Sequence, residues 1–186
     1  MSAYTRPTAS GPGATSAAPL VPHACYTAIV LGAKAATGKR PPYNKRVDLE
    51  VQILAPDVIE NLNGTKSRPG GVKGPLMLTF SEANMQNCVD ALQNLGLTFP
   101  PTAASFEEDV EAIRAAALAQ LPNRVFDIRV SSKREEVVNP DGSPMLDSRG
   151  QPILGQERPD FNMFNIVGNS RTAEQAVAEG LRIGPF

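Results

Sequence analysis

Residues that carry catalytic or metal-binding chemistry are scarce in this sequence. It contains no tryptophan, one histidine (His23) and two cysteines, Cys25 and Cys88, which are not in Cys-x-x-Cys spacing. A zinc site needs clustered Cys and His side chains, and a Ser-His-Asp triad needs a turn that presents its nucleophile. No glycine-rich segment ends in the Gly-Lys-Ser/Thr of a phosphate-binding loop. We therefore expect a protein without enzymatic activity, metal site or cofactor.

Two further absences concern the compartment. No apolar run approaches the ~20 residues that span a bilayer. The N-terminal segment lacks the charged start and apolar centre of a secretory signal. Two isolated cysteines indicate a reducing compartment and not a disulfide framework. The sequence thus predicts a soluble, cytoplasmic protein without a membrane partner.

The charges are unevenly distributed along the chain, although the net charge at pH 7 is −1. No acidic residue precedes Asp48, whereas six lysines and arginines do. Up to residue 81, nine basic residues stand against four acidic ones, and the remainder has nine basic against fifteen acidic. Such an asymmetry indicates a basic surface on one face of the fold.

The chain divides into an arm, a body and a tail. Residues 1–22 are rich in Ala, Ser, Thr, Pro and Gly, with almost no large apolar side chain. Such a segment cannot bury enough surface to offset its ordering entropy, so it is predicted to be a disordered arm. The body is expected over residues 23–168, and a weakly helical tail over residues 169–186.

Alternating and β-rich runs predict the strands of the body. In the clearest run, Val47, Leu49 and Val51 face one way while Asp48 and Glu50 face the other. A basic loop is expected between the first two strands, and a glycine-rich loop between the second and third. The predicted strands are residues 25–32, 47–54, 76–80, 124–131 and 161–167, with loops at 34–46 and 61–74.

Two helices are predicted between the third and fourth strands. Ser81 is expected to be the N-cap of the first helix, whose apolar residues recur at helical spacing, and Gly96 suits its C-terminal cap. Ser105 and Glu108 have capping-box spacing at the start of the second helix, and Pro122 ends it.

A short repeat lies between the fourth and fifth predicted strands. Gly-Ser-Pro-Met-Leu (142–146) recurs as Gly-Gln-Pro-Ile-Leu (150–154), each copy preceded by an aspartate turn. The ligand spacing of a calcium-binding loop is absent. The stretch therefore predicts a twisted hairpin or an extended loop.

The order of elements is three strands, a helical insert and two strands. An oligonucleotide-binding (OB) barrel has this order, with its helix between the third and fourth strands. The expected fold class is mainly β with inserted helices (α+β), as a five-stranded OB-like antiparallel barrel. A generic α+β sandwich would have the same order.

The basic loop at 34–46 carries five cations around one tyrosine and contains no acidic residue. Binding a single strand needs cations along a groove and flat side chains on which bases stack. In OB barrels the loops between strands one and two and between strands four and five line that groove. Aromatic residues are only 5% of the chain, so binding should depend mainly on phosphates and be salt-sensitive. Tyr26 and Phe161 are further stacking candidates. The candidate nucleic-acid-binding residues are Lys34, Lys39, Arg40, Tyr43, Lys45, Arg46, Lys66, Arg68, Lys73, Lys133 and Arg134.

This layout resembles the OB-fold single-stranded-DNA-binding proteins encoded by bacteriophages. The likeness covers residues 23–168 and rests on YNKRVDLEVQIL, the glycine-rich loop, LMLTF, a helix ending in NLGL, and RVFDIRV with NMFNIVG. It implies binding of single-stranded DNA, without sequence preference or cofactor, during replication or recombination in the host cytoplasm. Replication or recombination proteins are the implied partners. Some members dock partners through an acidic tail ending in Pro-Phe; this chain also ends Pro185-Phe186, but Arg182 and the missing aspartate run depart from that pattern.

Two other functions remain open. A disordered arm, a β-rich body and a turn-rich hairpin suit a viral or other structural or assembly protein, a homo-oligomer without nucleic-acid binding. The acidic cluster at 107–111 fits the first turn of a helix, where the dipole favours negative charge. A nuclease that uses carboxylates and a metal is the remaining alternative.

Overall fold

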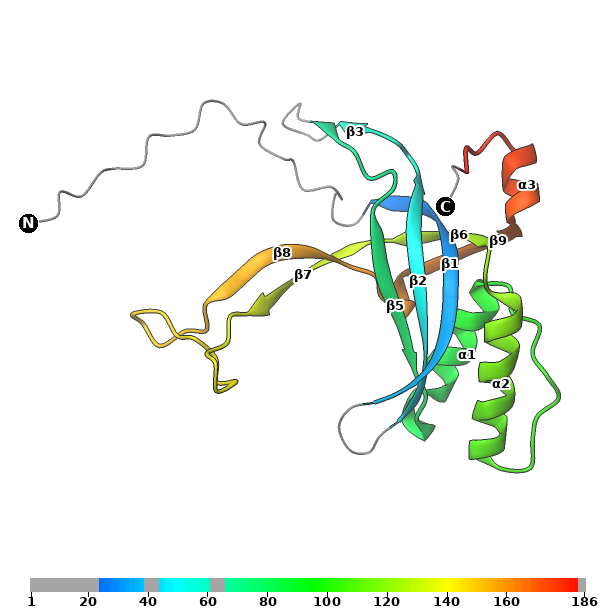
Figure 1. Ribbon diagram of the computed structural model, residues 1–186, viewed down its shortest axis with the longest axis horizontal. Helices are drawn as coiled ribbons and strands as arrows, with labels where there is room; N and C mark the ends of the chain where they lie inside the picture. Colours follow the sequence, from blue (N-terminus) through cyan, green and yellow to red (C-terminus); the bar gives the residue numbers. More distant parts are fainter. Residues whose placement is uncertain (1–23, 39–43, 61–65, 184–186) are drawn as a thin grey trace, which may run out of the picture.

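The computed structural model describes residues 24–38, 44–60 and 66–183, so the arm predicted for residues 1–22 lies outside the described residues. A five-stranded antiparallel sheet forms the body, in the order β5-β2-β1-β6-β9 (Figure 1). The mainly β class with a five-stranded antiparallel sheet is confirmed. The sheet is not closed, since β5 and β9 are its two edges, and the predicted barrel is not confirmed. The strands are β1 (Cys25–Thr37), β2 (Lys45–Ala55), β5 (Lys73–Thr79), β6 (Arg124–Arg129) and β9 (Ile166–Thr172).

Alternating side chains give the sheet a buried inner face and a more exposed outer face. In β2, Val47, Leu49 and Val51 are buried, whereas Asp48 is half-buried and Glu50 is exposed. This confirms the alternation predicted for the run. A strand with one apolar face is stable only when that face is covered, and here the two inserted helices cover it.

The helical insert lies between β5 and β6, as predicted. A 3₁₀ turn, η1 (Glu82–Asn84), leads into α1 (Met85–Asn94), and α2 (Phe106–Gln120) follows. Both helices lie on the same side of the sheet (Figure 1), with α2 against β1 and β2 and α1 against β9. Leu92 of α1 and Ile113 of α2 are buried in the main hydrophobic core with the inner face of the sheet.

The two predicted helix caps differ in their hydrogen bonds. Ser105 accepts a hydrogen bond from the Glu108 backbone N–H, so its predicted capping role is confirmed. Ser81 makes no such bond with its side chain, so its predicted capping role is wrong: the chain enters α1 through η1 instead.

This difference predicts unequal effects of two alanine substitutions. Ser105→Ala is expected to lower the free energy of unfolding by about 1 kcal/mol, because it leaves a helix N–H without its partner. Ser81→Ala, the matched control, is expected to change it by less than about 0.5 kcal/mol. Urea unfolding followed by circular dichroism measures both, and equal losses would contradict the assignment of the caps.

A third helix covers part of the outer face. Thr172 caps α3 (Ala173–Ala178) in a complete capping box. Ala176 is buried in a second, smaller hydrophobic core with Ile29, Leu54 and Val125. Ile29 and Val125 alternate with residues of the main core, so α3 lies on the face opposite α1 and α2. The helical part of the predicted tail thus packs on the outer face of the sheet.

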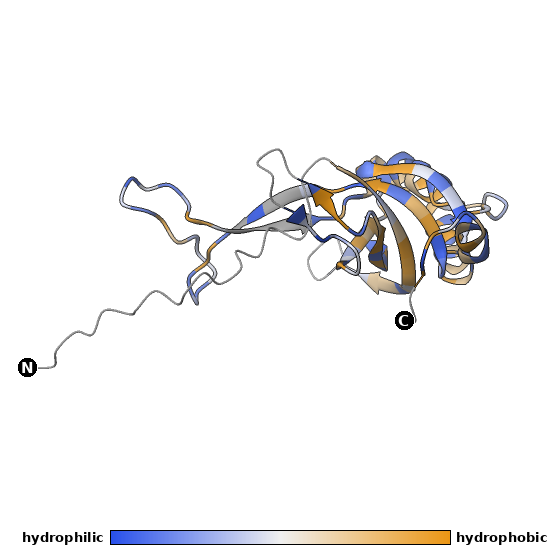
Figure 2. Ribbon diagram, turned by 90° about the horizontal axis from the view of Figure 1, so that it is seen from above, coloured by the Kyte–Doolittle hydropathy of each residue, from blue (hydrophilic) through white to orange (hydrophobic). Residues whose placement is uncertain are grey.

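Two small sheets extend from the body. β3 (Ile59–Glu60) pairs with β4 (Lys66–Ser67), and β7 (Ser131–Glu136) pairs with β8 (Leu154–Asp160). The β7–β8 hairpin includes the repeated turns at its far end and projects away from the body (Figures 1 and 2). The predicted hairpin between the last two strands of the main sheet is therefore confirmed.

The last strand begins later than predicted. Residues 161–165 are not in the sheet, because the Asn162 side chain accepts a hydrogen bond from Phe164 N–H and starts a 3₁₀ turn, η2 (Met163–Asn165). Strand β9 therefore runs over Ile166–Thr172 and not over residues 161–167. Phe161 turns into the main core beside β5, where its ring lies so close to Gly74 that a β-carbon there would overlap it.

The buried thiol of Cys88 gives the fold a pH dependence in the alkaline range. Burial raises the pKa of this thiol from 9.0 to about 11, and its Sγ lies 3.3 Å from the Thr79 carbonyl oxygen, to which it donates. The folded state therefore retains a proton that the unfolded state loses, so this contribution is intact below about pH 9 and declines as pH rises toward 11.

For this reason the free energy of unfolding is expected to fall by about 2 to 3 kcal/mol between pH 8 and pH 11 through this thiol alone. Urea unfolding of the Cys88→Ala variant should show a correspondingly shallower pH dependence. Cys25 is exposed, and the Cys25→Ala variant should retain the slope of the unmodified protein. A Cys88→Ala variant with an unchanged slope would contradict the argument.

Candidate nucleic-acid interface

Both ends of the predicted basic loop are strand. The β1–β2 pairing continues to Thr37 and Lys45, so Lys34 lies within β1 while Lys45 and Arg46 open β2. The loop predicted at 34–46 is correspondingly wrong at both ends, since the proline and glycine residues that suggested it are confined to residues 38–42. Lys39, Arg40 and Tyr43 lie outside the described residues.

A β-bulge determines which face Lys34 occupies. The register between β1 and β2 shifts between Val30 and Gly32, and Val30 and Ala33 both contact the main core. Simple alternation from Val30 would turn Lys34 inward. The extra residue instead places Gly32 and Lys34 on the outer face, opposite Glu50 and Asp48, which is a common use of bulges beside functional surfaces.

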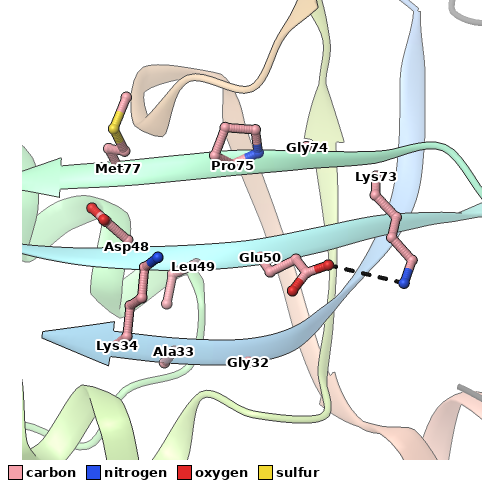
Figure 3. A pocket seen from close by; sticks show the side chains of 10 residues that line it. All are labelled: Gly32, Ala33, Lys34, Asp48, Leu49, Glu50, Lys73, Gly74, Pro75 and Met77. Carbon is pink, nitrogen blue, oxygen red and sulfur yellow. Dashed lines mark ion pairs between the residues drawn. The ribbon is translucent and has the colours of Figure 1, made fainter.

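A depression of about 500 Å³ lies on this outer face, across β1, β2 and β5 (Figure 3). Gly32 leaves room in it, since no atom lies within 4 Å of a β-carbon placed there. Met77 is 51% exposed although its side chain is large and apolar, and Pro75 on the same face of β5 is also exposed. The depression is lined by Gly32, Ala33, Lys34, Asp48, Leu49, Glu50, Lys73, Gly74, Pro75 and Met77.

Lys34 and Lys73 stand at the two ends of the depression, with Asp48 beside Lys34 and Glu50 between the two ends (Figure 3). In the strand register Lys34 lies opposite Asp48, and Lys73 lies opposite Gln52. Because Asp48 and Gln52 are four residues apart on β2, the two lysine positions are about 13 Å apart along the strand. Lys73 Nζ lies 3.9 Å from Glu50 Oε1, and both side chains are more than half exposed. An exposed pair at this distance contributes little and leaves Lys73 available to a ligand.

Lys45 and Arg46 are engaged within the protein. Lys45 Nζ lies 2.7 Å from Glu111 Oε1 of α2, an oxygen that also accepts from Arg114 Nη1 at 2.7 Å. The hydrogen bond from Lys45 is the main reason that the pKa of Glu111 is lowered, and the Arg114 charge adds to it. Arg46 binds Asp48 through two contacts, Nε–Oδ1 at 2.8 Å and Nη2–Oδ2 at 3.0 Å. Lys45 therefore connects the start of β2 to α2, and Arg46 neutralises the Asp48 carboxylate.

Of the other candidate residues, two lie on the segment before β5 and two lie on β7. Lys66 and Arg68 are exposed on the segment that leads into Lys73. Lys133 and Arg134 belong to β7; Arg134 is exposed, and the Lys133 side chain lies outside the description. The structure thus brings Lys34 and Lys73 to one depression and places β7 on a separate hairpin.

Two stacking candidates are wrong and several lining residues were missed. Tyr26 is 1% exposed and Phe161 6%, so neither ring is available to a base. Gly32, Glu50 and Met77 line the depression but were not predicted. The outward position of Met77 could have been predicted from strand alternation. Its neighbours Leu76 and Leu78 are both fully buried, so Met77 between them faces outward.

Within the described residues, no group of His, Cys, Asp and Glu side chains is arranged to hold a metal ion. None of the helices in the described part of the chain has the length and apolarity needed to cross a membrane. Comparison of the sequence with known protein families finds no matching family, and comparison with curated proteins finds no match.

Proposed function

We propose that this protein binds single-stranded DNA across the outer face of β1, β2 and β5. The observation that carries the proposal is the depression itself, with a cation at each end and an exposed methionine beside it. Lys34 and Lys73 would neutralise phosphates, while Met77 and Pro75 offer an apolar surface to a base. Methionine suits this contact, because its polarizable thioether interacts favourably with aromatic rings.

The arrangement of the sheet supports an OB-like architecture for this function. Two helices separate the third and fourth strands of the main sheet, and the fourth and fifth are joined through a long hairpin, β7–β8. OB folds are partly open five-stranded barrels that bind oligonucleotides on the face of strands two and three. The depression occupies the corresponding strands, β2 and β5, together with β1.

The biological setting proposed is protection of single strands during phage-type replication or recombination, in the cytoplasm. Contacts to phosphates do not depend on base identity, so binding should be largely tolerant of sequence. The exposed cations Lys66 and Arg68 would extend the track beyond Lys73.

Fluorescence anisotropy tests this function directly. A labelled oligo-dT of ~30 nucleotides, beside a duplex of equal length, is titrated with the full chain at about 50 and 200 mM salt. The single strand is expected to bind much more tightly than the duplex and to lose affinity steeply with salt. Absence of binding at 50 mM salt would overturn the proposal.

A second candidate function is assembly with further copies of this chain. Its support is the projecting hairpin, on which Val138, Leu146 and Leu154 are each more than half exposed although all are large and apolar. Light scattering of the DNA-free protein discriminates the two functions. A large assembly without DNA favours the second, and a monomer or dimer favours the first.

A further inference from the structure

Glu50 lies in the middle of the depression with unused capacity to accept hydrogen bonds. In the register it lies between Gly32 of β1 and Pro75 of β5, and its side chain is 61% exposed. Its ion pair is the 3.9 Å contact to Lys73. An ionised carboxylate offers two oxygens with about four acceptor positions.

The charges around Glu50 favour a neutral group over a phosphate. A phosphate placed here would meet the carboxylate at close range, and like charges repel. The other carboxylate of the depression, Asp48, is held by Arg46 through two contacts. A strand that places phosphates near Lys34 and Lys73 therefore presents a base to Glu50.

From this geometry, and resting on the proposed function, we propose that Glu50 reads the base in the depression by accepting a hydrogen bond from its exocyclic amino group. Cytosine carries an amino donor at N4, where thymine and uracil carry an acceptor oxygen at O4. A carboxylate can pair with the first and is repelled by the second. The binding of single strands should therefore include a preference for cytosine over uracil or thymine.

The preference should be modest in size. Good bidentate base contacts discriminate by about 1–3 kcal/mol, but Glu50 is exposed and water competes for its oxygens. We expect oligo-dC to bind about fivefold more tightly than oligo-dU, measured at pH 8 and equal salt. Uracil is the matched probe, because it lacks the methyl group of thymine and stacks much as cytosine does.

Two variants test the roles of the carboxylate and of the space beside it. Glu50→Gln replaces one acceptor by a donor, so the amide can pair with either base and the dC/dU ratio should fall to about one.

Gly32→Leu fills the depression. No atom lies within 4 Å of a β-carbon at Gly32, and the backbone there is not left-handed, so the fold should accept the side chain. This variant should bind both oligonucleotides more weakly and should also lose the preference.

The controls separate this inference from the proposed function. Glu107→Gln removes an exposed carboxylate from α2, on the other side of the sheet, and should keep the fivefold ratio. Thermal unfolding of each variant verifies that it is folded. Equal affinities of the unmodified protein for oligo-dC and oligo-dU, or a ratio that persists in Glu50→Gln, would overturn the inference while leaving strand binding intact. No binding to either strand would overturn the proposed function and the inference together.

Discussion

Replacing Phe161 by alanine is expected to lower the free energy of unfolding by about 3 to 5 kcal/mol, because it leaves a cavity in a closely packed core. The side chain is 6% exposed and belongs to the main core. It packs beside β5, the edge strand that makes no hydrogen-bonded pair with the opposite edge, β9. Urea unfolding followed by circular dichroism measures the loss.

Gly74→Ala provides the matched test of where the ring lies. In the unmodified protein the new β-carbon would overlap the Phe161 ring, and such overpacking costs about 1–3 kcal/mol. In the Phe161→Ala background the methyl group would enter vacated space, so the two losses should not add. Strictly additive losses in the double variant would show that the ring does not occupy this position.

Removing Lys34 and Lys73 together is expected to weaken binding of the single strand about tenfold at low salt, since charge-assisted contacts are stronger than neutral ones. Each phosphate contact contributes about 0.7 to the slope of log affinity against log salt for single strands, so the slope should become shallower by about 1.4. Anisotropy titrations of the Lys34→Ala/Lys73→Ala variant at several salt concentrations measure both quantities.

Arg182→Ala is the control for a change in overall charge. Arg182 is exposed near the C-terminal end of the described residues, outside the depression, and its loss should leave the salt slope within error. Lys45 and Arg46 are unsuitable for this test, because their removal would also break contacts with Glu111 and Asp48. If the Lys34/Lys73 variant bound like the unmodified protein, the depression would not be the binding site.

Local patterns predicted much of the fold. The alternation from Val47 to Ile53 identified the buried face of β2, and helical spacing identified α1 and α2. The Ser105 cap was predicted because its hydrogen bond joins residues three apart. These features depend on neighbours along the chain, so the sequence around them contains the information.

Other features were not predicted from the residue types. Ser81 has the residue type of a cap, but the chain enters α1 through a 3₁₀ turn that places its side chain elsewhere. Residues 161–165 have the composition of a strand, yet the Asn162 turn and burial of Phe161 against Gly74 remove them from the sheet. Composition alone does not distinguish these outcomes: the two turns are short local hydrogen-bonded turns, whereas the position of Phe161 depends on packing against β5.

The candidate site shows the same division. The sequence by itself determined that cations gather early in the chain, that β2 has one apolar face and that helices separate the third and fourth strands of the main sheet. Only the tertiary structure decided that Lys45 and Arg46 bind carboxylates of the protein, while a bulge before Gly32 turns Lys34 outward toward the depression. The physical reason is that charge and hydrophobic period are local properties. The partner of a side chain, and the face it occupies, depend on which strands and helices meet.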